Sequence, residues 1–479
     1  MKKTKSCIAL ICAVVMLMTA FVVVPVTANA EDQKASKSGD TYPTLTYAKK
    51  NEKGEYKVTN LSPKSGSTSH IWTNSRYAVI TAVLSSKSNS SDISTAAITI
   101  GKNSDGYYWK IIADEKLKNS FNSLDGKGYY YIQELFGLIK GKEKDYTLEI
   151  NIPKRNYYVN GFFRVYGNTT IIGSGCTFIK TNDNPVFVNF DDSDAQIFDL
   201  KGNIESKGTE KYNGSSNINI GNINVNCSNN KKYYRNGFMY AAHASKLNIN
   251  NVSVKNAKYD GHAFQITAMN DVVIENSTFT NCLYYATKDK KGKITGYSKY
   301  DRSKLSKYHE IDNGKYGSEL LNKEIIQIEP DYSVKPNEDT FAVPTIRMSN
   351  DDTVSKNITI KGCTFNNVMR AIGNHSNRGG RCHDIKITSN NISNTIGHGI
   401  VLSKDKNVTV KGNTFTSISS SKICGSPIYA VTYGKNDDKF TINNNKYKLY
   451  KGCKVYKLVK KWKWFLRKWQ YVLSLVFLE

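Results

Sequence analysis

The sequence KNITIKGCTFNNV at residues 356–368 recurs as HDIKITSNNISNT at 383–395 and as KNVTVKGNTFTSI at 406–418. In each copy two apolar residues stand two positions apart, which is the spacing of side chains on one face of a β-strand. A third apolar residue follows after a polar step, at which the chain can turn into another strand. A short strand pattern that repeats in this way predicts a solenoid, in which every copy contributes one coil.

The same pattern extends over much of the chain, and its three apolar positions are apolar in every copy. The first position is filled by Ile218, Leu247, Val272, Ile358, Ile385, Val408 and Phe440. The second position is filled by Ile220, Ile249, Ile274, Ile360, Ile387, Val410 and Ile442. The third position is filled by Val225, Val254, Phe279, Phe365, Ile392, Phe415 and Tyr447. Most copies stand roughly 25 to 30 residues apart, as one coil of a parallel β-helix requires, and the longer gap after Val272 must contain insertions.

A polar column accompanies the pattern toward the C-terminus. Two residues before the third apolar position, successive copies have Asn390, Asn413 and Asn445. Stacked asparagines at one turn position can hydrogen-bond along the stack as a ladder. The β-branched residues at a period of two argue against an amphipathic helical repeat, and the leucine pattern of leucine-rich repeats is absent. The sequence therefore predicts an all-β solenoid.

A second strand is expected in front of each copy of the pattern, so that every coil consists of strand, turn, pattern and turn. These strands are expected at Gly237–Ala241, Gly261–Thr267, Lys323–Glu329, Met369–His375, Gly397–Ser403 and Pro427–Tyr433. Upstream, Tyr129–Lys140 has the pattern of a short amphipathic helix, and Leu148–Lys180 that of the first strands. A helix over the open end of a solenoid would protect its core and its exposed strand edge.

The first coils resemble a known superfamily. Tyr131-Ile132-Gln133, then TLEINIPKRNYYV (147–159) and NTTIIGSGCTF (168–178) are similar to the opening of pectate-lyase-like and polygalacturonase-like proteins. In that superfamily a capping helix leads to an IPxGxYy strand and an NxtIxGxGxtF coil; here Arg155-Asn156 replaces the usual glycine. The resemblance covers roughly residues 129–447. It implies a right-handed parallel β-helix with an N-terminal capping helix, placed at residues 126–447.

The two ends of the chain differ from this region. Residues 1–30 have a lysine-rich start, an apolar run over Ile8–Val24 and the small-x-small pattern Ala28-Asn29-Ala30, which predict a cleaved signal peptide and a secreted or cell-surface protein. The alternative is a membrane anchor. Residues 31–125 fit either a small β module or added coils. Residues 448–479 are basic and rich in Trp and Lys. They fit either an amphipathic helix that binds anionic surfaces or a truncated or frame-shifted wall-binding module. This tail could associate with the cell wall.

The composition of the chain narrows the classes of molecule that it could bind. The formal net charge is +26, and the chain stays basic without its two basic ends. A basic body favours acidic polysaccharide or wall polymer, although a lysine-rich surface can also be mere composition, and secretion argues against nucleic acid. The cysteines outside the signal peptide are odd in number and lack metal-ligand spacing, so buried free thiols are expected. No cofactor and no metal site are expected, since Asp191, Asp192 and Asp194 fit a solvated turn, and the protein is expected to be a monomer.

Stacking the second strands in register predicts where polar residues gather. One outward column would contain Gln265 and Gln327, and the next would contain Glu329 and His375. A third column, at the start of these strands, consists of His262, Glu324, Arg370 and His398. Each of these histidines alone would by default be structural, but their convergence on one face points to a site. We expect Glu329, His375, Arg370 and Gln327 to lie within hydrogen-bonding or one-water reach.

Long insertions flank the coil of Glu329, at about 283–322 and 331–356, and such loops can form the walls of a groove. The first contains Tyr284 and Tyr285, which are suited to stacking on sugars. Insertions are also simply tolerated in loops. The candidate substrate-binding residues are Gln327, Gln265, Glu324, Tyr284 and Tyr285.

Two chemistries fit these residues. Glycoside hydrolysis needs two carboxyl groups, and Glu329 could pair with Glu324, Asp331 or Asp260. Gly397-His398-Gly399 resembles the GHG motif of polygalacturonases, but their paired-aspartate motif is missing and no RIK follows. Elimination from a uronate needs a cation and a base, for which Arg370 and His375 are candidates, with Glu329 tuning the histidine.

The sequence therefore predicts a secreted polysaccharide lyase or glycoside hydrolase that acts on an extracellular, acidic polysaccharide. The candidate catalytic residues are Glu329, His375, Arg370, His398 and His262. The alternative is a non-catalytic cell-surface protein that uses the same groove for glycan binding or adhesion.

Overall fold

The computed structural model describes the greater part of the chain. The described residues are 56–58, 70–104, 106–121, 131–181, 185–189, 212–227, 237–257, 262–288, 294–299, 324–331, 353–374, 380–403, 405–418, 426–432 and 439–460. The predicted signal peptide lies outside these residues. No helix among them is long and apolar enough to cross a membrane.

Two large sheets contain most of the strands. The twenty-stranded sheet consists of β1 (Tyr56–Val58), β2 (His70–Trp72), β3 (Ala78–Ser86), β4 (Ile93–Asn103), β5 (Gly106–Ala113), β6 (Tyr146–Asn151), β7 (Asn156–Asn160), β9 (Thr169–Lys180), β11 (Ile218–Asn226), β13 (Ser245–Lys255), β15 (Asn270–Glu275), β16 (Thr278–Cys282), β20 (Lys356–Lys361), β21 (Thr364–Val368), β23 (His383–Thr388), β24 (Asn391–Thr395), β26 (Lys406–Lys411), β27 (Thr414–Thr416), β29 (Phe440–Asn443) and β30 (Lys446–Lys448). The nine-stranded sheet consists of β8 (Phe163–Arg164), β10 (Pro185–Val188), β12 (Gly237–Ala242), β14 (Phe264–Thr267), β19 (Glu324–Glu329), β22 (Arg370–Gly373), β25 (Ile400–Ser403), β28 (Ile428–Thr432) and β31 (Tyr456–Lys460).

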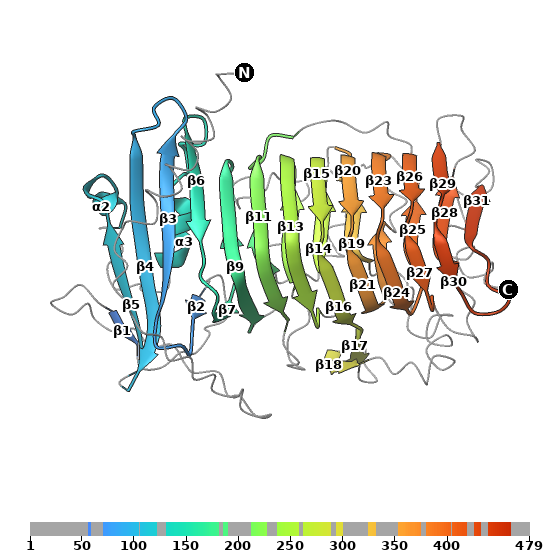
Figure 1. The fold of residues 1–479 in the computed structure, drawn as a ribbon, viewed down its shortest axis with the longest axis horizontal. Helices are drawn as coiled ribbons and strands as arrows, with labels where there is room; N and C mark the ends of the chain where they lie inside the picture. The colour runs from blue at the N-terminus through green and yellow to red at the C-terminus, as the bar shows by residue number, and fades with distance from the viewer. Residues whose placement is uncertain are drawn as a thin grey trace, which may run out of the picture. The chain divides into compact units, whose positions relative to one another are not determined.

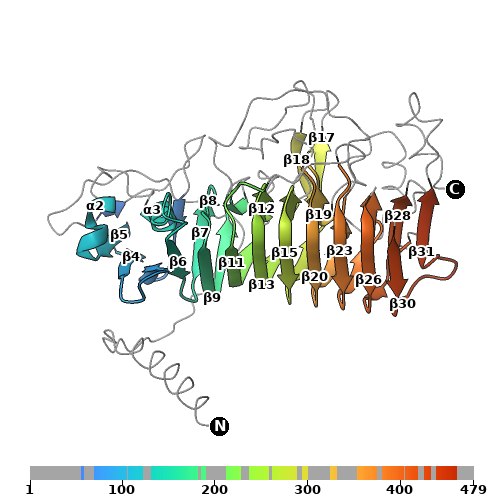
Figure 2. The same ribbon diagram turned by 90° about the horizontal axis from the view of Figure 1, so that it is seen from above.

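The remaining elements are two helices, α2 (Glu115–Phe121) and α3 (Tyr131–Gly137), and a hairpin of β17 (Tyr284–Lys288) and β18 (Ile294–Lys299). The hairpin stands away from both sheets (Figure 2). Figure 1 shows the strands of successive coils side by side in sequence order, from β9 to β30. From β9 onward the neighbouring strands of the twenty-stranded sheet are parallel, as the predicted right-handed parallel β-helix requires.

The predicted register is confirmed at the repeated pattern. Ile218 pairs with Leu247, Leu247 with Val272 and Val272 with Ile358, and the column continues to Phe440. The second and third apolar positions form columns in the same way. Most members of these columns are fully buried, and the aromatic ones stack along the axis, with ring centroids 5.1 Å apart for Phe279 and Phe365. The core therefore consists of columns in which apolar residues at equivalent positions of successive coils stack on one another.

Residues with positive φ bend the chain between the two strands of each pattern. Four positions after the first apolar residue, φ lies between 51° and 68° in coil after coil, a left-handed conformation that asparagine and glycine adopt most readily. These residues are Asn222, Asn251, Asn276, Gly362, Ser389, Gly412 and Asn444. The asparagines and glycines of the repeat therefore supply its corners.

The predicted asparagine ladder is present. The side-chain oxygen of Asn413 accepts hydrogen bonds from the backbone and side-chain nitrogens of Asn390, both at 2.9 Å. The side-chain nitrogen of Asn413 donates to the carbonyl of Ile387 at 2.9 Å and to the side-chain oxygen of Asn445 at 3.0 Å. Asn390 and Asn413 are buried, so the ladder satisfies polar groups that have no access to water.

The first coil is not covered as the sequence suggested. The predicted helix forms as α3, and Phe136 stacks on Phe163 with ring centroids 5.4 Å apart, but a helical cap over the strand edge is not confirmed. The edge strand β6 pairs instead with β3, and β3, β4 and β5 are antiparallel to one another. Residues 78–113 therefore form a β module joined to the solenoid, rather than added coils.

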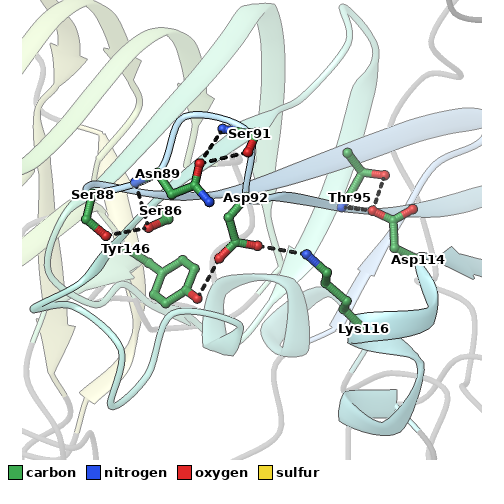
Figure 3. A network of polar contacts seen from close by, with 9 residues as sticks. All are labelled: Ser86, Ser88, Asn89, Ser91, Asp92, Thr95, Asp114, Lys116 and Tyr146. Atoms are coloured by element: carbon green, nitrogen blue, oxygen red, sulfur yellow. Dashed lines mark hydrogen bonds and ion pairs between the residues drawn. The ribbon is translucent and has the colours of Figure 1, made fainter.

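Polar contacts tie this module together at its corner (Figure 3). Asp92, just before β4, accepts a hydrogen bond from Lys116 of α2 at 2.8 Å and one from the hydroxyl of Tyr146 of β6 at 2.9 Å. Thr95 of β4 donates its hydroxyl to Asp114 at 3.0 Å. These contacts connect the module both to α2 and to the first coil. At the other end, β31 pairs in parallel with β28, so regular pairing continues into the segment assigned to the basic tail.

The inside and outside positions of a coil should respond differently to truncation. We expect Phe365→Ala to lower the free energy of unfolding by about 3–5 kcal/mol, because it opens a cavity in a buried stack. Thr359 lies between inward positions and is half-buried, so Thr359→Ala should cost under about 0.5 kcal/mol. Denaturant unfolding measures both, and equal losses would contradict the assignment of faces.

Loss of one asparagine of the ladder should destabilise the protein, because it also leaves polar groups of the neighbouring asparagine without a partner. Asn413→Ala removes the acceptor of two nitrogens on Asn390 and should cost about 1–3 kcal/mol. Asn391→Ala, at an exposed position next to the ladder, is the matched control and should change stability by less than about 0.5 kcal/mol. A negligible effect at Asn413 in the same unfolding experiment would show that the ladder is not stabilising.

Candidate functional site

The outer side of four neighbouring strands, β14, β19, β22 and β25, contains most of the residues that the sequence singled out. Their register is the predicted one, because Gln265 pairs with Gln327, Gln327 with Gly373, and Thr267 with Glu329. Gly373 has a φ of 143°, and a Cβ there would lie 1.7 Å from the carbonyl oxygen of Val401, so only glycine fits.

The expectation that these outward columns face solvent is wrong. Every residue of β19, β22 and β25 is buried, whereas β26 of the other sheet alternates between buried and more exposed residues. Glu329 is 1% exposed and Gln327 is 4% exposed. The outer side of these strands is therefore a second, polar interior, in which each charge needs a partner.

An ion pair links the start of β19 to the start of β22. A guanidinium nitrogen of Arg370 donates to Glu324 at 3.2 Å, and both side chains are buried. Gly397 leaves room for this arginine, because a Cβ at residue 397 would lie 3.2 Å from its Nε. Burial raises the pKa of Tyr429 and the positive charge of Arg370 opposes this shift, so the two side chains are close enough to interact.

The two histidines of this column each donate through Nδ1 to a backbone carbonyl. His262 donates to the carbonyl of Glu324 at 2.6 Å, and His398 to that of Ser426 at 2.8 Å. The ring of His398 stacks on Tyr429 with ring centroids 4.8 Å apart. These bonds fix the tautomer and the orientation of both rings.

A second group of charged side chains lies at the far end of the same strands. Gln327 donates to Glu329 at 3.3 Å, and Nε2 of His243 lies 3.0 Å from a carboxylate oxygen of Asp331. Asp331 is fully buried. We call Glu329, Asp331 and Asp405 the carboxyl cluster.

Asp405 is the member of the cluster with the most perturbed ionisation. Its Oδ1 accepts a hydrogen bond from Asn374 at 2.8 Å, and its buried Oδ2 makes no hydrogen bond to the described residues. Burial raises the pKa of Asp405 well above its usual range, and the negative charge of Glu329 adds to this effect. The bond from Asn374 and the charge of Arg381 act in the opposite direction. Asp405 is therefore a buried carboxyl group with a raised pKa, and it lies close enough to Glu329 for the two charges to interact.

Most of the remaining predicted site residues are not described by the structure. His375 and Asp260 lie outside the described residues, and so do the side chains of Tyr284 and Tyr285, whose backbone forms β17. Gln265 is half-buried and lies 3.5 Å from the hydroxyl of Thr267. Among the described residues no cluster of His, Cys, Asp and Glu side chains is arranged to hold a metal ion.

Sequence reasoning missed Asp405, His243 and Arg381. Asp405 follows Ser403 by two positions, as Asp331 follows Glu329, and Ser403 and Glu329 stand in one predicted column. Asp331 was already a candidate partner of Glu329, and the same step past the end of the strand at Ser403 would have found Asp405. His243 and Arg381 have no such signal, because both lie beyond the ends of the strands next to them.

In comparisons with known proteins, this chain is similar to solved structures alone. No family model and no curated protein matches the sequence. Among solved structures, PfbA, a surface adhesin of Streptococcus pneumoniae, is similar at a TM-score of 0.41 and 15% identity, over 66% of this chain and 74% of that one. The A-module of the mannuronan C-5 epimerase AlgE4 of Azotobacter vinelandii is similar at 0.16 and 9%, over 66% and 89%. The catalytic domain of a GH87 α-1,3-glucanase is similar at 0.19 and 11%, over 88% and 97%. These values do not bear on function.

The raised pKa of Asp405 should be visible in unfolding. Between the unfolded and folded pKa values the folded chain keeps a proton that the unfolded chain releases, so stability falls as the pH rises through this window. Asp405→Asn removes this effect while retaining an oxygen for the bond from Asn374. We expect the variant to melt above the wild type at about pH 8, with the difference vanishing toward about pH 4.

Asp384→Asn is the control for this experiment. Hydrogen bonds from His383 and Asn407 lower the pKa of Asp384 despite partial burial, so its substitution should not stabilise the protein at high pH. A melting difference for Asp405→Asn that does not change with pH would contradict the raised pKa.

Proposed function

We propose that the protein is a secreted carbohydrate-active enzyme that hydrolyses glycosidic bonds of an extracellular, acidic polysaccharide, with Asp405 and Glu329 as its carboxyl pair. One observation carries this proposal: a buried aspartic acid with a strongly raised pKa next to a second buried carboxyl group. Glycoside hydrolysis uses two carboxyl groups in different protonation states, and their different surroundings set those states.

The hydrogen bonds assign a role to each carboxyl group. Asn374 donates to Oδ1 of Asp405, which leaves Oδ2 to hold the proton and give it to the oxygen of the departing sugar. Glu329 accepts a hydrogen bond from Gln327, as a carboxylate does, and would act as base or nucleophile on the sugar. Asn374 is itself held, because its side-chain oxygen accepts the backbone N–H of Ser403 at 2.6 Å.

Hydrolysis fits these contacts better than elimination. A lyase needs a cation that neutralises the uronate carboxylate, and the charge of Arg370 is already balanced by the buried Glu324. His375 remains the candidate base for elimination. The acidic substrate and the extracellular setting rest on the basic body and the predicted signal peptide, and association with a cell wall through the tail is part of the same proposal.

A second function, glycan binding without turnover, has one observation in its favour. His398 lies just before β25 and its ring stacks on that of Tyr429 of β28, and the half-buried tyrosine offers an aromatic surface of the kind that sugars stack on. A binding protein would need this surface and would not need a protonated Asp405.

Turnover of acidic and neutral polysaccharides should separate these functions. We expect Asp405→Asn and Glu329→Gln each to lower the rate of reducing-end release by a factor of about 100 or more, because each removes one half of an acid–base pair. Asp384→Asn, the same change on the other sheet, should leave the rate unchanged. Wild-type activity should fall as the pH rises through the raised pKa of Asp405.

Each other outcome is informative. The ultraviolet absorbance of unsaturated uronates in place of simple reducing-end release would indicate a lyase and overturn the hydrolase proposal. Binding of polysaccharide without any turnover, lost gradually on Tyr429→Ala, would establish the binding protein instead.

A further inference from the structure

The outer face of the twenty-stranded sheet has a different character at its C-terminal coils. Five exposed lysines lie on β20, β23, β26 and β30, and we call them the lysine array: Lys361, Lys386, Lys411, Lys446 and Lys448. They point away from the core, because buried residues alternate with them on the same strands. Of the carboxyl cluster, Glu329 lies on the other sheet, while Asp331 and Asp405 lie just after the ends of β19 and β25.

Strand register fixes how these lysines are spaced. Lys361 and Lys411 are both paired with Thr388 of the strand between them, so they stand two strands apart, about 9.6 Å. Lys386 lies two residues before Thr388 on that middle strand. Lys446 and Lys448 lie on β30, which stacks on β27 beyond the corner at Gly412 and Asn444, so they add positive charge to the adjoining flank of the coil. Positive charges therefore recur at regular intervals along several coils.

Little negative charge opposes the array. Glu275 lies 3.6 Å from Lys361, at its N-terminal border. Between residues 353 and 460, the carboxylates of the described residues are Asp384, which is bonded to His383 and Asn407, and the buried Asp405. The half-exposed Lys356 and Lys406 extend the positive face at the start of β20 and β26. The face thus carries a concentrated positive field.

The residues between the lysines indicate the kind of partner. The other outward positions of β20, β23 and β26 include Thr359, Thr388 and Thr409, which can hydrogen-bond to sugar hydroxyl groups. The remaining outward positions, one at the start of each strand, are Asn357, Asp384 and Asn407. Aromatic side chains, on which nucleic acid bases would stack, do not occur at these described positions. Lysine binds as a hydrated point charge, which suits carboxylates spaced along a flexible polymer.

We propose that this face is a binding surface for a linear acidic polysaccharide, separate from the carboxyl cluster. A chain that crosses the strands would meet a lysine on successive or alternate coils, with threonine hydroxyl groups between them. The surface would keep the protein on its polymer. This inference does not rest on the proposed hydrolysis, because it requires binding alone.

The test is binding of polygalacturonate to the full chain, measured by calorimetry at low and moderate salt. We expect the double variant Lys386→Gln, Lys411→Gln to bind roughly tenfold more weakly at about 50 mM salt and to show a shallower salt dependence, because fewer counterions are released. The matched control is the double variant Lys110→Gln, Lys154→Gln, which removes two lysines, exposed like those of the array, from β5 and the turn after β6. Its affinity should change less than twofold. Thermal unfolding of each variant verifies that it is folded.

Two results would overturn the inference. An equal loss in both double variants would mean that binding follows net charge and not this face. Duplex DNA that binds as tightly as polygalacturonate at the same salt would mean that the face does not select polysaccharide. Failure of the hydrolase proposal is distinguishable, because Glu329→Gln and Asp405→Asn would then leave turnover unaffected while lysine-dependent binding persists.

Discussion

The structure depends on one constraint, that each coil must set its apolar residues directly over those of the coil before it. A shift of one residue in any strand would exchange its buried and exposed faces, so the stacked columns from Ile218 to Phe440 fix the register of the whole solenoid. The asparagine ladder reinforces this register, because Asn390 and Asn413 satisfy their polar groups only when successive coils are aligned. The nine-stranded sheet inherits the same alignment, and Glu324 thereby meets Arg370 on the next strand.

The two sheets use this scaffold in opposite ways. On the side of the nine-stranded sheet, acids and their partners are withdrawn from water, and burial together with the negative charge of Glu329 raises the pKa of Asp405. On the twenty-stranded sheet, lysines remain in solvent, where their charges act at long range. A solenoid allows this separation, because only the inward side chains of the two sheets share the core, as Phe178 and Phe187 do, while the outward side chains of each sheet lie on their own side of the coil.

Much of the fold follows from the sequence alone, because the pattern of apolar residues is local and repeated. The columns, the ladder, the second strands and the pairing of Gln327 with Gln265 are all set by spacing. The antiparallel module at the N-terminus was not decided by spacing, since alternation in β3 and β4 fits either strand direction. The burial of Glu329 could not be predicted from the sequence either, because alternation identifies the outer side of a strand but not what shields it from solvent. Asp405 was missed for a related reason: its ionisation arises from neighbours that are distant in sequence.

The asparagine ladder has a consequence for how such a chain can change in evolution. Each asparagine of the ladder bonds to its neighbours in the same way: the side chain of Asn413 accepts a hydrogen bond from Asn390 and donates one to Asn445. Deletion or duplication of a complete coil would therefore bring two ladder asparagines next to each other again. Loss of part of a coil would leave an asparagine without an asparagine at the equivalent position of the next coil. Genes for proteins of this type should therefore gain and lose sequence in whole coils.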